Sequence, residues 1–265
     1  MLNSIFKIIY PLVRRLYYFF EIHNYEIRQG IAKGLRRKGG LSFIPQIFPH
    51  TPEEIFLLNL NLKSKTIYDV GGFEGILTIF FANAVGDNGT VITFEPNPKN
   101  YQKLVENVKI NNFGNLVKIY QLAIGEKKGK VTFAYSHFNP AQGSIQYSSR
   151  IGISRGKGEH VFQVDIDSLD NQLKTKSFPK PDMIKIDVEG SEFDVLCGMK
   201  EIIRNFKPEL FIEIHGINEE NRVKNIQDVV DFLISNGYSI YHIESCKKIN
   251  RCNTPLAKEG HLYAY

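Results

Sequence analysis

A glycine-rich turn between two short apolar runs, within residues 66–97, constrains the fold of this chain more than any other feature. The first run ends at Asp69-Val70, and the second ends at Glu95, 26 positions after Asp69. Glycines allow positive φ and a close approach of the backbone to a ligand. A strand, a glycine turn, a helix and a second strand with an acidic tip are typical of half a nucleotide-binding α/β unit. The turn contains Gly71, Gly72 and Gly75.

The spacing of the turn discriminates between nucleotide ligands. A dinucleotide fingerprint needs the pattern G-x-G-x-x-G, but Phe73 occupies the position of its second glycine. Asp69 lies two residues before the first glycine, where its carboxylate would repel a pyrophosphate and suit a cationic sulfonium group. The turn therefore favours S-adenosylmethionine over NAD. The alternative is an ordinary strand–turn–helix unit in which Asp69 is a capping residue.

Each candidate residue around this turn has an expected role. We expect Asp69 to lie near the methionine end of the ligand, directly or through water. Glu95 should accept hydrogen bonds from ribose hydroxyls. Asn97 would flank the adenine, and Ala123 begins the turn after a third predicted strand. The predicted cofactor-binding residues are Asp69, Gly71, Gly72, Gly75, Glu95, Asn97, Ala123 and Asp187.

Strands and helices alternate along most of the chain, which predicts an α/β fold with a mostly parallel sheet. A chain of 265 residues, 43% of them hydrophobic, suits one large domain with an appendage. We assign residues 51–265 to this domain and residues 1–50 to a basic, aromatic, helical arm. The runs at 238–244 and 261–265 lack a full helix between them, which predicts a terminal antiparallel hairpin.

Basic residues concentrate in the arm. Residues 1–50 contain eight Lys or Arg and two Glu, whereas the net charge of the whole chain is +5, so the domain is nearly neutral. This distribution argues against a nucleic-acid partner. The arm has no apolar run of the roughly 20 residues that span a bilayer, and it does not resemble a signal peptide. Its candidate roles are packing on the domain, packing on a second copy in a homo-oligomer, and peripheral membrane contact.

The cysteines predict a reducing compartment. Cys197, Cys246 and Cys252 have neither disulfide-like spacing nor a partnering pair of metal ligands. We therefore expect a cytoplasmic protein, with the membrane surface as an alternative location through the arm.

The string K-I-D-V-E-G at 185–190 carries the main catalytic candidates. It ends a predicted strand, and ligands of open α/β sheets bind at the carboxyl ends of strands. Asp187 and Glu189 would share a face with Lys185, and one of the two carboxylates would orient or deprotonate an acceptor hydroxyl. His215 ends the next strand, where a neutral imidazole would serve as general base.

Two alternatives remain open for these residues. Lys185, Asp187 and Glu189 can form a structural ion-pair network, and His215 can be a structural histidine. The carboxylates, with help from Glu213, can also bind a divalent cation, because carboxylate oxygens suit Mg²⁺. No complete set of ligands is visible in the sequence, so we assign no metal.

Residues 136–159 have the composition of a long loop, because Ser, Gly, Asn and Gln dominate them and no period is present. A loop of this length within a compact domain is usually functional, so we expect it to shape the acceptor pocket. Arg150 and Arg155 suggest an anionic acceptor, and His137 is a weaker candidate for the base.

The string K-I-D-V-E-G-S-E at 185–192 resembles the FkbM-type methyltransferases. The resemblance implies a seven-stranded Rossmann-like sheet, S-adenosylmethionine as the methyl donor, and O-methylation of a sugar, glycan, glycolipid or secondary metabolite. Family members commonly have Ala-Asn where this chain has Gly72-Phe73. The other matches occur in the same order along residues 51–245: D-V-G at 69–71 with Gly75, F-E-P at 94–96, A-I-G at 123–125, Asp165 with Ser168-Leu169-Asp170, and Glu213 with His215.

These observations predict an O-methyltransferase that acts on a small-molecule, sugar or glycolipid acceptor. The alternative is a catalytically inactive binding module of the same fold, docked to a membrane or a partner. An NAD-linked oxidoreductase is disfavoured by Phe73 in the turn.

Overall fold

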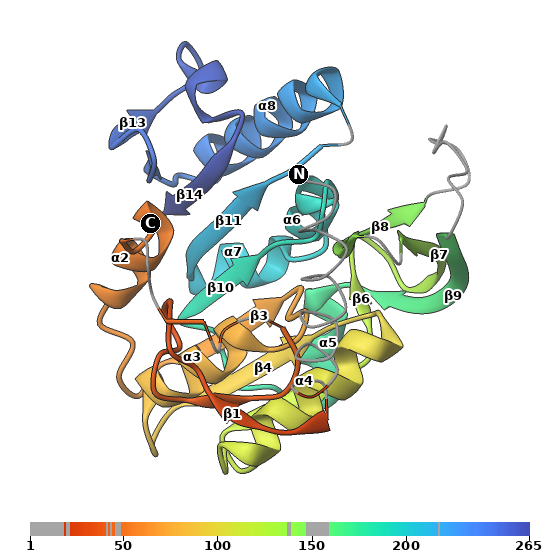
Figure 1. Cartoon of the computed structure of the whole chain (residues 1–265). Helices are drawn as coiled ribbons and strands as arrows, with labels where there is room; N and C mark the ends of the chain where they lie inside the picture. Colours follow the sequence, from red (N-terminus) through yellow and green to blue (C-terminus); the bar gives the residue numbers. More distant parts are fainter. Residues whose placement is uncertain are drawn as a thin grey trace, which may run out of the picture.

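Within the described residues, the computed structural model contains a large mixed sheet with helices on both faces, a smaller four-stranded sheet and a two-stranded ladder (Figure 1). The predicted α/β class is therefore confirmed. The structure describes residues 19, 22–40, 42, 44–45, 49–136, 139–146, 159–216 and 218–265, without the side chains of 134–136, 139–146 and 159–161.

The strands are β1 (Tyr25–Glu26), β2 (Arg36–Arg37), β3 (Thr66–Val70), β4 (Thr90–Phe94), β5 (Val117–Tyr120), β6 (Ala123–Ile124), β7 (Gly129–Ser136), β8 (Asn139–Gln146), β9 (Glu159–Asp167), β10 (Met183–Ile186), β11 (Glu209–Ile214), β12 (Ile240–His242), β13 (Lys247–Ile249) and β14 (Gly260–Ala264). The helices are α2 (Pro52–Leu58), α3 (Ile76–Val85), α4 (Pro98–Ile110), α5 (Leu169–Lys176), α6 (Glu192–Cys197), α7 (Lys200–Phe206), α8 (Glu219–Ser235) and the short 3-10 helix η1 (Thr254–Ala257).

The large sheet has the strand order β13-β12-β14-β11-β10-β3-β4-β5 among the described residues. The five strands from β11 to β5 are parallel, and β14 is antiparallel to both β11 and β12. The sheet has eight strands rather than the expected seven, because β13 pairs with β12 at the edge. The chain proceeds from β3 outward to β4 and β5 and then returns to β10, so a topological switch point lies between β3 and β10. Ligands bind at the carboxyl ends of strands at such a point.

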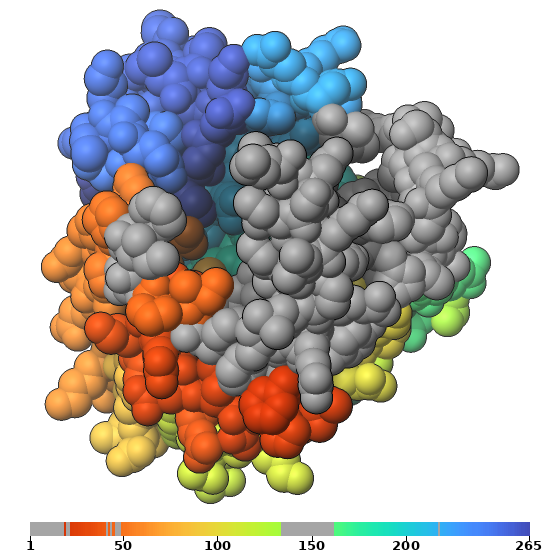
Figure 2. Space-filling view, in the orientation of Figure 1, coloured from red at the N-terminus to blue at the C-terminus, as the bar shows by residue number. Residues whose placement is uncertain are grey.

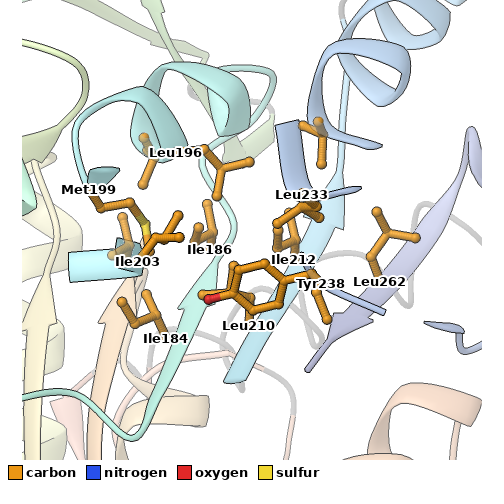
Figure 3. Close-up of a cluster of buried hydrophobic side chains, with 14 of the residues drawn as sticks. Ile184, Ile186, Leu196, Met199, Ile203, Leu210, Ile212, Leu233, Tyr238 and Leu262 are labelled. Carbon is orange, nitrogen blue, oxygen red and sulfur yellow. The ribbon is translucent and has the colours of Figure 1, made fainter. Parts of the chain in front are cut away.

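Side chains of alternating strand residues form the cores on the two faces of the large sheet. Ile67 of β3 is buried in the cluster that includes the side chains of α3, whereas its neighbour Tyr68 is buried in the cluster that includes those of α6, α7 and α8. Successive residues of a strand point to opposite faces, which explains the division. In Figure 3, Ile184, Ile186, Leu210 and Ile212 of β10 and β11 lie together with Leu196, Ile203 and Leu233 of the covering helices and with Met199 between α6 and α7.

The segment at 22–40 differs from the helical arm that we expected through residue 50. It contains the antiparallel β1–β2 ladder, and Ile27 is buried in the core on the α3 side of the sheet. Arg37 Nη2 donates a hydrogen bond of 2.6 Å to the buried Glu74 carboxylate. In Figure 2 this segment, in red to orange-red, lies on the surface in the lower part of the view. Burial of an apolar side chain and a paired charge stabilises this segment against the domain.

Part of the predicted loop at 136–159 is a strand. The described residues 139–146 form β8, which pairs with β7, and β7 also pairs with β9. The polar sequence of β8 shows no hydrophobic alternation, but the backbone hydrogen bonds of β7 are available to any side-chain pattern. Arg150, Arg155 and His137 lie outside the described residues. Among the described residues, no helix has the length and apolar character needed to cross a bilayer.

Candidate functional site

A cavity of about 280 Å³ lies at the carboxyl ends of β3, β4, β10 and β11. This is the switch point of the sheet, where the fold leads us to expect a ligand. The predicted residues that line the cavity are Gly71, Glu95, Ala123, Asp187, Glu189 and His215.

Gly71 brings the turn after β3 into close contact with the chain after β10. Its φ is +86°, and a Cβ added to it would lie 1.8 Å from the carbonyl oxygen of Asp187. Its carbonyl oxygen accepts a hydrogen bond of 2.8 Å from Lys185 Nζ. Only glycine has both the conformational freedom and the space for this contact.

Phe73 and Glu95 form the next contact of the glycine turn. Phe73 adopts a left-handed conformation, with φ of +49°, at the position where the resembling family commonly has asparagine. Asparagine tolerates this conformation better than most residues. The backbone N–H of Phe73 donates to Glu95 Oε2 at 2.8 Å, and that of Asn97 donates to Oε1 at 2.8 Å. The two bonds fix the Glu95 carboxylate at the cavity wall.

Burial dominates the electrostatics of Glu95, whose side chain is almost inaccessible to solvent. It raises the pKa of this carboxyl to about 7, although the N–H groups of Asn97 and Phe73 favour the charged form. Each carboxylate oxygen has more than one lone pair, so Glu95 retains the capacity to accept hydroxyl donors.

Asp69 lies behind the cavity wall rather than in it. The residue is fully buried, and Thr78 Oγ1 donates to its Oδ2 at 2.6 Å. Its Oδ1 makes no hydrogen bond within the described residues and lies 3.5 Å from Lys185 Nζ. Asp69 therefore contacts the elements that shape the turn and does not line the cavity.

Lys185 connects Asp69, the turn and Asp187. Its buried ammonium group donates to Asp187 Oδ2 at 3.0 Å as well as to the Gly71 carbonyl. Burial by itself lowers the pKa of Lys185, but the carboxylates of Asp187 and Asp69 outweigh burial, and the pKa lies above its ordinary value. The predicted pairing with Asp187 is present, and Lys185 has the contacts of a positioning residue.

His215 lies among four carboxylates. Its Nδ1 is 3.3 Å from Glu192 Oε1 and 3.8 Å from Asp187 Oδ1, and its Nε2 is 3.2 Å from Glu213 Oε1 and 3.9 Å from Glu189 Oε2. Burial by itself lowers the pKa of the imidazole, but the bonds with Glu192 and Glu213 and the nearby charges raise it to about 11. In this arrangement the ring is protonated at neutral pH, whereas we expected a neutral imidazole.

Glu189 lies beyond the end of β10, although we predicted that it continues the strand alternation with Lys185 and Asp187. β10 ends at Ile186, and Glu189 follows in a turn with φ of +56°. Burial raises the pKa of its carboxyl to about 7, against the charge of His215 and with a contribution from Asp187. The turn, rather than strand alternation, brings Glu189 and Asp187 to the same cavity.

The other predicted residues support the site from outside the cavity. Gly72 packs against β4 and α4, since an added Cβ would lie 2.3 Å from Thr93 Cγ2 and 2.7 Å from Leu104 Cδ1. Gly75 is the N-cap of α3 with φ of +89°, and Asn97 caps α4 by accepting from Lys99 N at 3.0 Å.

The sequence analysis missed Asn100 and Phe133, which line the cavity. Asn100 lies one turn of α4 after Asn97, a spacing that could have indicated it. Phe133 belongs to β7 of the smaller sheet, and no local pattern indicates that β7 reaches the switch point. The apolar Phe133 and Ala123 lie in the same cavity as the carboxylates, so the lining combines apolar and acidic surface.

Comparisons with known proteins agree with this architecture. The Methyltransferase FkbM domain matches residues 69–240. The hexuronic acid methyltransferase AglP of Haloferax volcanii is 27% identical over 169 residues, which are 63% of each protein. Methyltransferase 1 of Beauveria bassiana is 22% identical over 147 residues, 51% of this chain and 58% of the relative. The aligned parts thus span less than two thirds of both relatives.

A solved structure supports the fold. The methyltransferase FkbM from Methylobacillus flagellatus superimposes with a TM-score of 0.51 and 19% identity, over 81% of this chain and 50% of that one. This likeness confirms the Rossmann-like methyltransferase fold that the resemblance implied. Since the domain match covers more than half of the chain, we conclude that the chain belongs to the FkbM methyltransferase family.

Proposed function

We propose that the protein is an S-adenosylmethionine-dependent O-methyltransferase that acts on a hydroxyl group of a sugar or glycan. One observation carries the proposal: the same cavity is lined by Gly71 and Glu95 of the glycine-turn unit and by Asp187, Glu189 and His215. When bound, S-adenosylmethionine supplies a methyl group that its sulfonium has already activated. The chain then has to position the two reactants and exclude water.

The residues of the glycine turn fit such a donor. Glu95 would accept the ribose hydroxyls, because its carboxylate is fixed by two N–H donors and retains free lone pairs. Gly71 allows the close approach of the turn to the chain after β10. Ala123 and Phe133 supply an apolar wall suited to the adenine. Asp187 would face the positive methionine end, held by Lys185.

The acidic residues and His215 would act on the acceptor. Transfer forms a bond between the acceptor oxygen and the methyl carbon, and the hydroxyl proton must leave. Asp187, Glu189 and His215 all line the cavity. The two carboxylates can accept a hydrogen bond or a proton from that hydroxyl, whereas the protonated His215 ring can donate a hydrogen bond to the acceptor. Lys185 acts through Asp187 and does not line the cavity itself.

The name of one relative supports the acceptor class. The Haloferax volcanii relative is named a hexuronic acid methyltransferase, and hexuronic acids are sugars with a carboxylate. Such an acceptor agrees with the anionic substrate that Arg150 and Arg155 suggest. We place the acceptor among acidic sugars and glycans on these grounds.

Labelled S-adenosylmethionine tests the proposal directly. The full chain is incubated with the labelled donor and fractionated cell glycans and lipids, and we expect label in a glycan fraction. Mild alkali removes a methyl ester but leaves a methyl ether, so alkali-stable label identifies transfer to a hydroxyl. Binding of S-adenosylhomocysteine without transfer to any fraction would instead favour the inactive binding module.

Glu95 makes donor binding dependent on pH. Only the carboxylate form provides charge-assisted hydrogen bonds to ribose hydroxyls, and the pKa of Glu95 is about 7. Binding that requires loss of this proton becomes stronger as the pH rises, by up to about tenfold per unit below the pKa. We expect S-adenosylhomocysteine affinity, measured by calorimetry, to rise between pH 6 and 7 and to level off above pH 8.

Matched variants isolate the contribution of Glu95. Glu95→Gln should weaken binding at pH 8 by about 10- to 100-fold, the value of one charged hydrogen bond, and should flatten the pH dependence. Glu189→Gln removes another carboxyl of the same cavity and should retain the slope. A Glu95→Gln protein with the parent's affinity and slope would refute the ribose role.

A further inference from the structure

Three side chains with metal-ligating atoms meet at the acceptor side of the cavity. Asp187, Glu213 and His215 each offer one ligand atom, and these atoms all lie within 4.8 Å of one another. All three residues line the cavity and are half-buried. Asp187 follows β10, Glu213 belongs to β11 and His215 follows β11, so neighbouring strands position the group.

Lys185 and Glu192 do not line the cavity, but they orient Asp187 and His215, two of the three side chains. Lys185 Nζ donates to Asp187 Oδ2 at 3.0 Å, which leaves Oδ1 for another partner. His215 Nδ1 lies 3.3 Å from Glu192 Oε1, and a carboxylate can only accept, so Nδ1 carries a hydrogen. Nε2 faces Glu213 Oε1 at 3.2 Å, and a cation bound there would replace the second ring proton, as metal binding generally releases protons from its ligands. Metal-binding histidines in proteins almost always donate their other N–H to such a group.

Glu192 has the burial and the hydrogen bonds needed to hold the His215 ring in place. It is fully buried, and its carboxylate accepts from Asn225 Nδ2 at 2.5 Å and from the Gly190 N–H at 2.9 Å. A buried, fixed carboxylate determines both the orientation and the tautomer of the His215 ring.

The third side chain, Glu213, faces a buried and unsatisfied histidine. His261 of β14 is 8% exposed, and its Nε2 makes no hydrogen bond among the described residues. That atom lies 3.5 Å from Glu213 Oε2, and Glu213 Oε1 lies on the other side, 3.2 Å from His215 Nε2. His261 Nδ1 is held at 2.6 Å by Glu244. Glu213 is therefore positioned to present one oxygen to the cavity while the other faces a donor.

We propose that Asp187, Glu213 and His215 bind a divalent cation of the Mn²⁺ or Mg²⁺ class. Carboxylate oxygens suit Mg²⁺ and Mn²⁺, and Mn²⁺, as a first-row transition metal, also binds an imidazole nitrogen. The excess of carboxylates at the site, with Glu189 3.9 Å from the imidazole, favours a doubly charged ion. Positions not filled by the chain would take acceptor oxygens, and the ion would make the acceptor hydroxyl easier to deprotonate. This catalytic role rests on the proposed methyl transfer, whereas the binding site does not.

Binding of Mn²⁺ alone tests the site without any donor or acceptor. The full chain is stripped with a chelator and titrated with Mn²⁺, and free Mn²⁺ is followed by electron paramagnetic resonance. We expect one saturable site per chain. Pulsed measurements should detect a nitrogen nucleus coupled to the bound ion, and this coupling should disappear in His215→Gln. Glu213→Gln should weaken binding by at least about 10- to 100-fold, because loss of a supporting residue alone costs that much.

Glu209→Gln is the matched control. It removes a carboxylate from the same strand, but Glu209 pairs with Lys65 outside the cavity, so Mn²⁺ binding should equal that of the parent. Circular dichroism and S-adenosylhomocysteine binding verify that the Glu213 and His215 variants are folded. Absence of saturable Mn²⁺ binding to the parent, or unchanged binding in both folded variants, would overturn the proposal. Saturable binding without methyl transfer would leave the site standing and count against the proposed function only.

Discussion

Replacing Gly71 with alanine should destabilise the protein by about 3 kcal/mol or more and abolish binding of S-adenosylhomocysteine. The added Cβ would lie 1.8 Å from the Asp187 carbonyl oxygen, which is backbone and cannot rotate away. Overpacking typically costs about 1–3 kcal/mol, and the left-handed conformation adds about 1–2 kcal/mol for a residue with a Cβ. For a chain of this size we expect a decrease in Tm of roughly 6–12 °C, measured by thermal unfolding.

Two other glycines separate the clash from the backbone strain. Gly86 has φ of +65°, and no atom of the described residues lies within 4 Å of an added Cβ, so Gly86→Ala has the backbone strain without the clash. Gly114 has neither feature, so Gly114→Ala should be close to neutral. If Gly71→Ala lowers the free energy of unfolding no more than Gly86→Ala does, the close contact between the turn after β3 and the chain after β10 is not the reason that position 71 requires glycine.

Replacing Lys185 with methionine should cost about 3–5 kcal/mol of folding free energy. The ammonium group is buried and is shared by Asp187, Asp69 and the Gly71 carbonyl. Methionine fills the space but leaves a fully buried Asp69 without a neighbouring positive charge, and breaking one side of a buried ion pair has this cost. Urea unfolding, followed by circular dichroism, measures the loss.

The matched control is Lys65→Met. Lys65 Nζ contacts Glu209 Oε2 at 2.6 Å, but both side chains are about one third exposed, and partly exposed pairs contribute only about 0–1 kcal/mol. Asp69→Asn in the Lys185→Met background should recover part of the lost stability, because it removes the uncompensated charge. Equal losses in the two lysine variants, or no recovery in the double variant, would contradict the role of Lys185 as the link between the turn and β10.

Much of the glycine-turn part of the cavity follows from local sequence. The glycine turn needs positive φ at Gly71 and Gly75, and the run after it is apolar enough for a buried helix. Glu95 directly follows Phe94, the last residue of β4. These features depend on backbone conformation within a few residues, so their spacing alone predicts them.

The part of the cavity around His215 depends on contacts between distant segments. His261 reaches Glu213 because β14 inserts antiparallel beside β11, and Glu192 reaches His215 because α6 follows β10 and packs beside β11. No spacing in the chain predicts these pairs. The structure differs from the neutral His215 that we expected for the same reason: Asp187 and Glu189 come from the loop after β10, Glu213 from β11 and Glu192 from α6.

By itself, the sequence determined the α/β class, the glycine turn and the acidic strand tips, because hydrophobic periodicity and glycine conformation are local properties. Only the tertiary structure decided which charged groups share a cavity. It placed Asp69 and Lys185 behind the wall and Asp187, Glu189, Glu213 and His215 in it. The physical reason is that the charge state and ligand capacity of a side chain depend on burial and on neighbours from other strands.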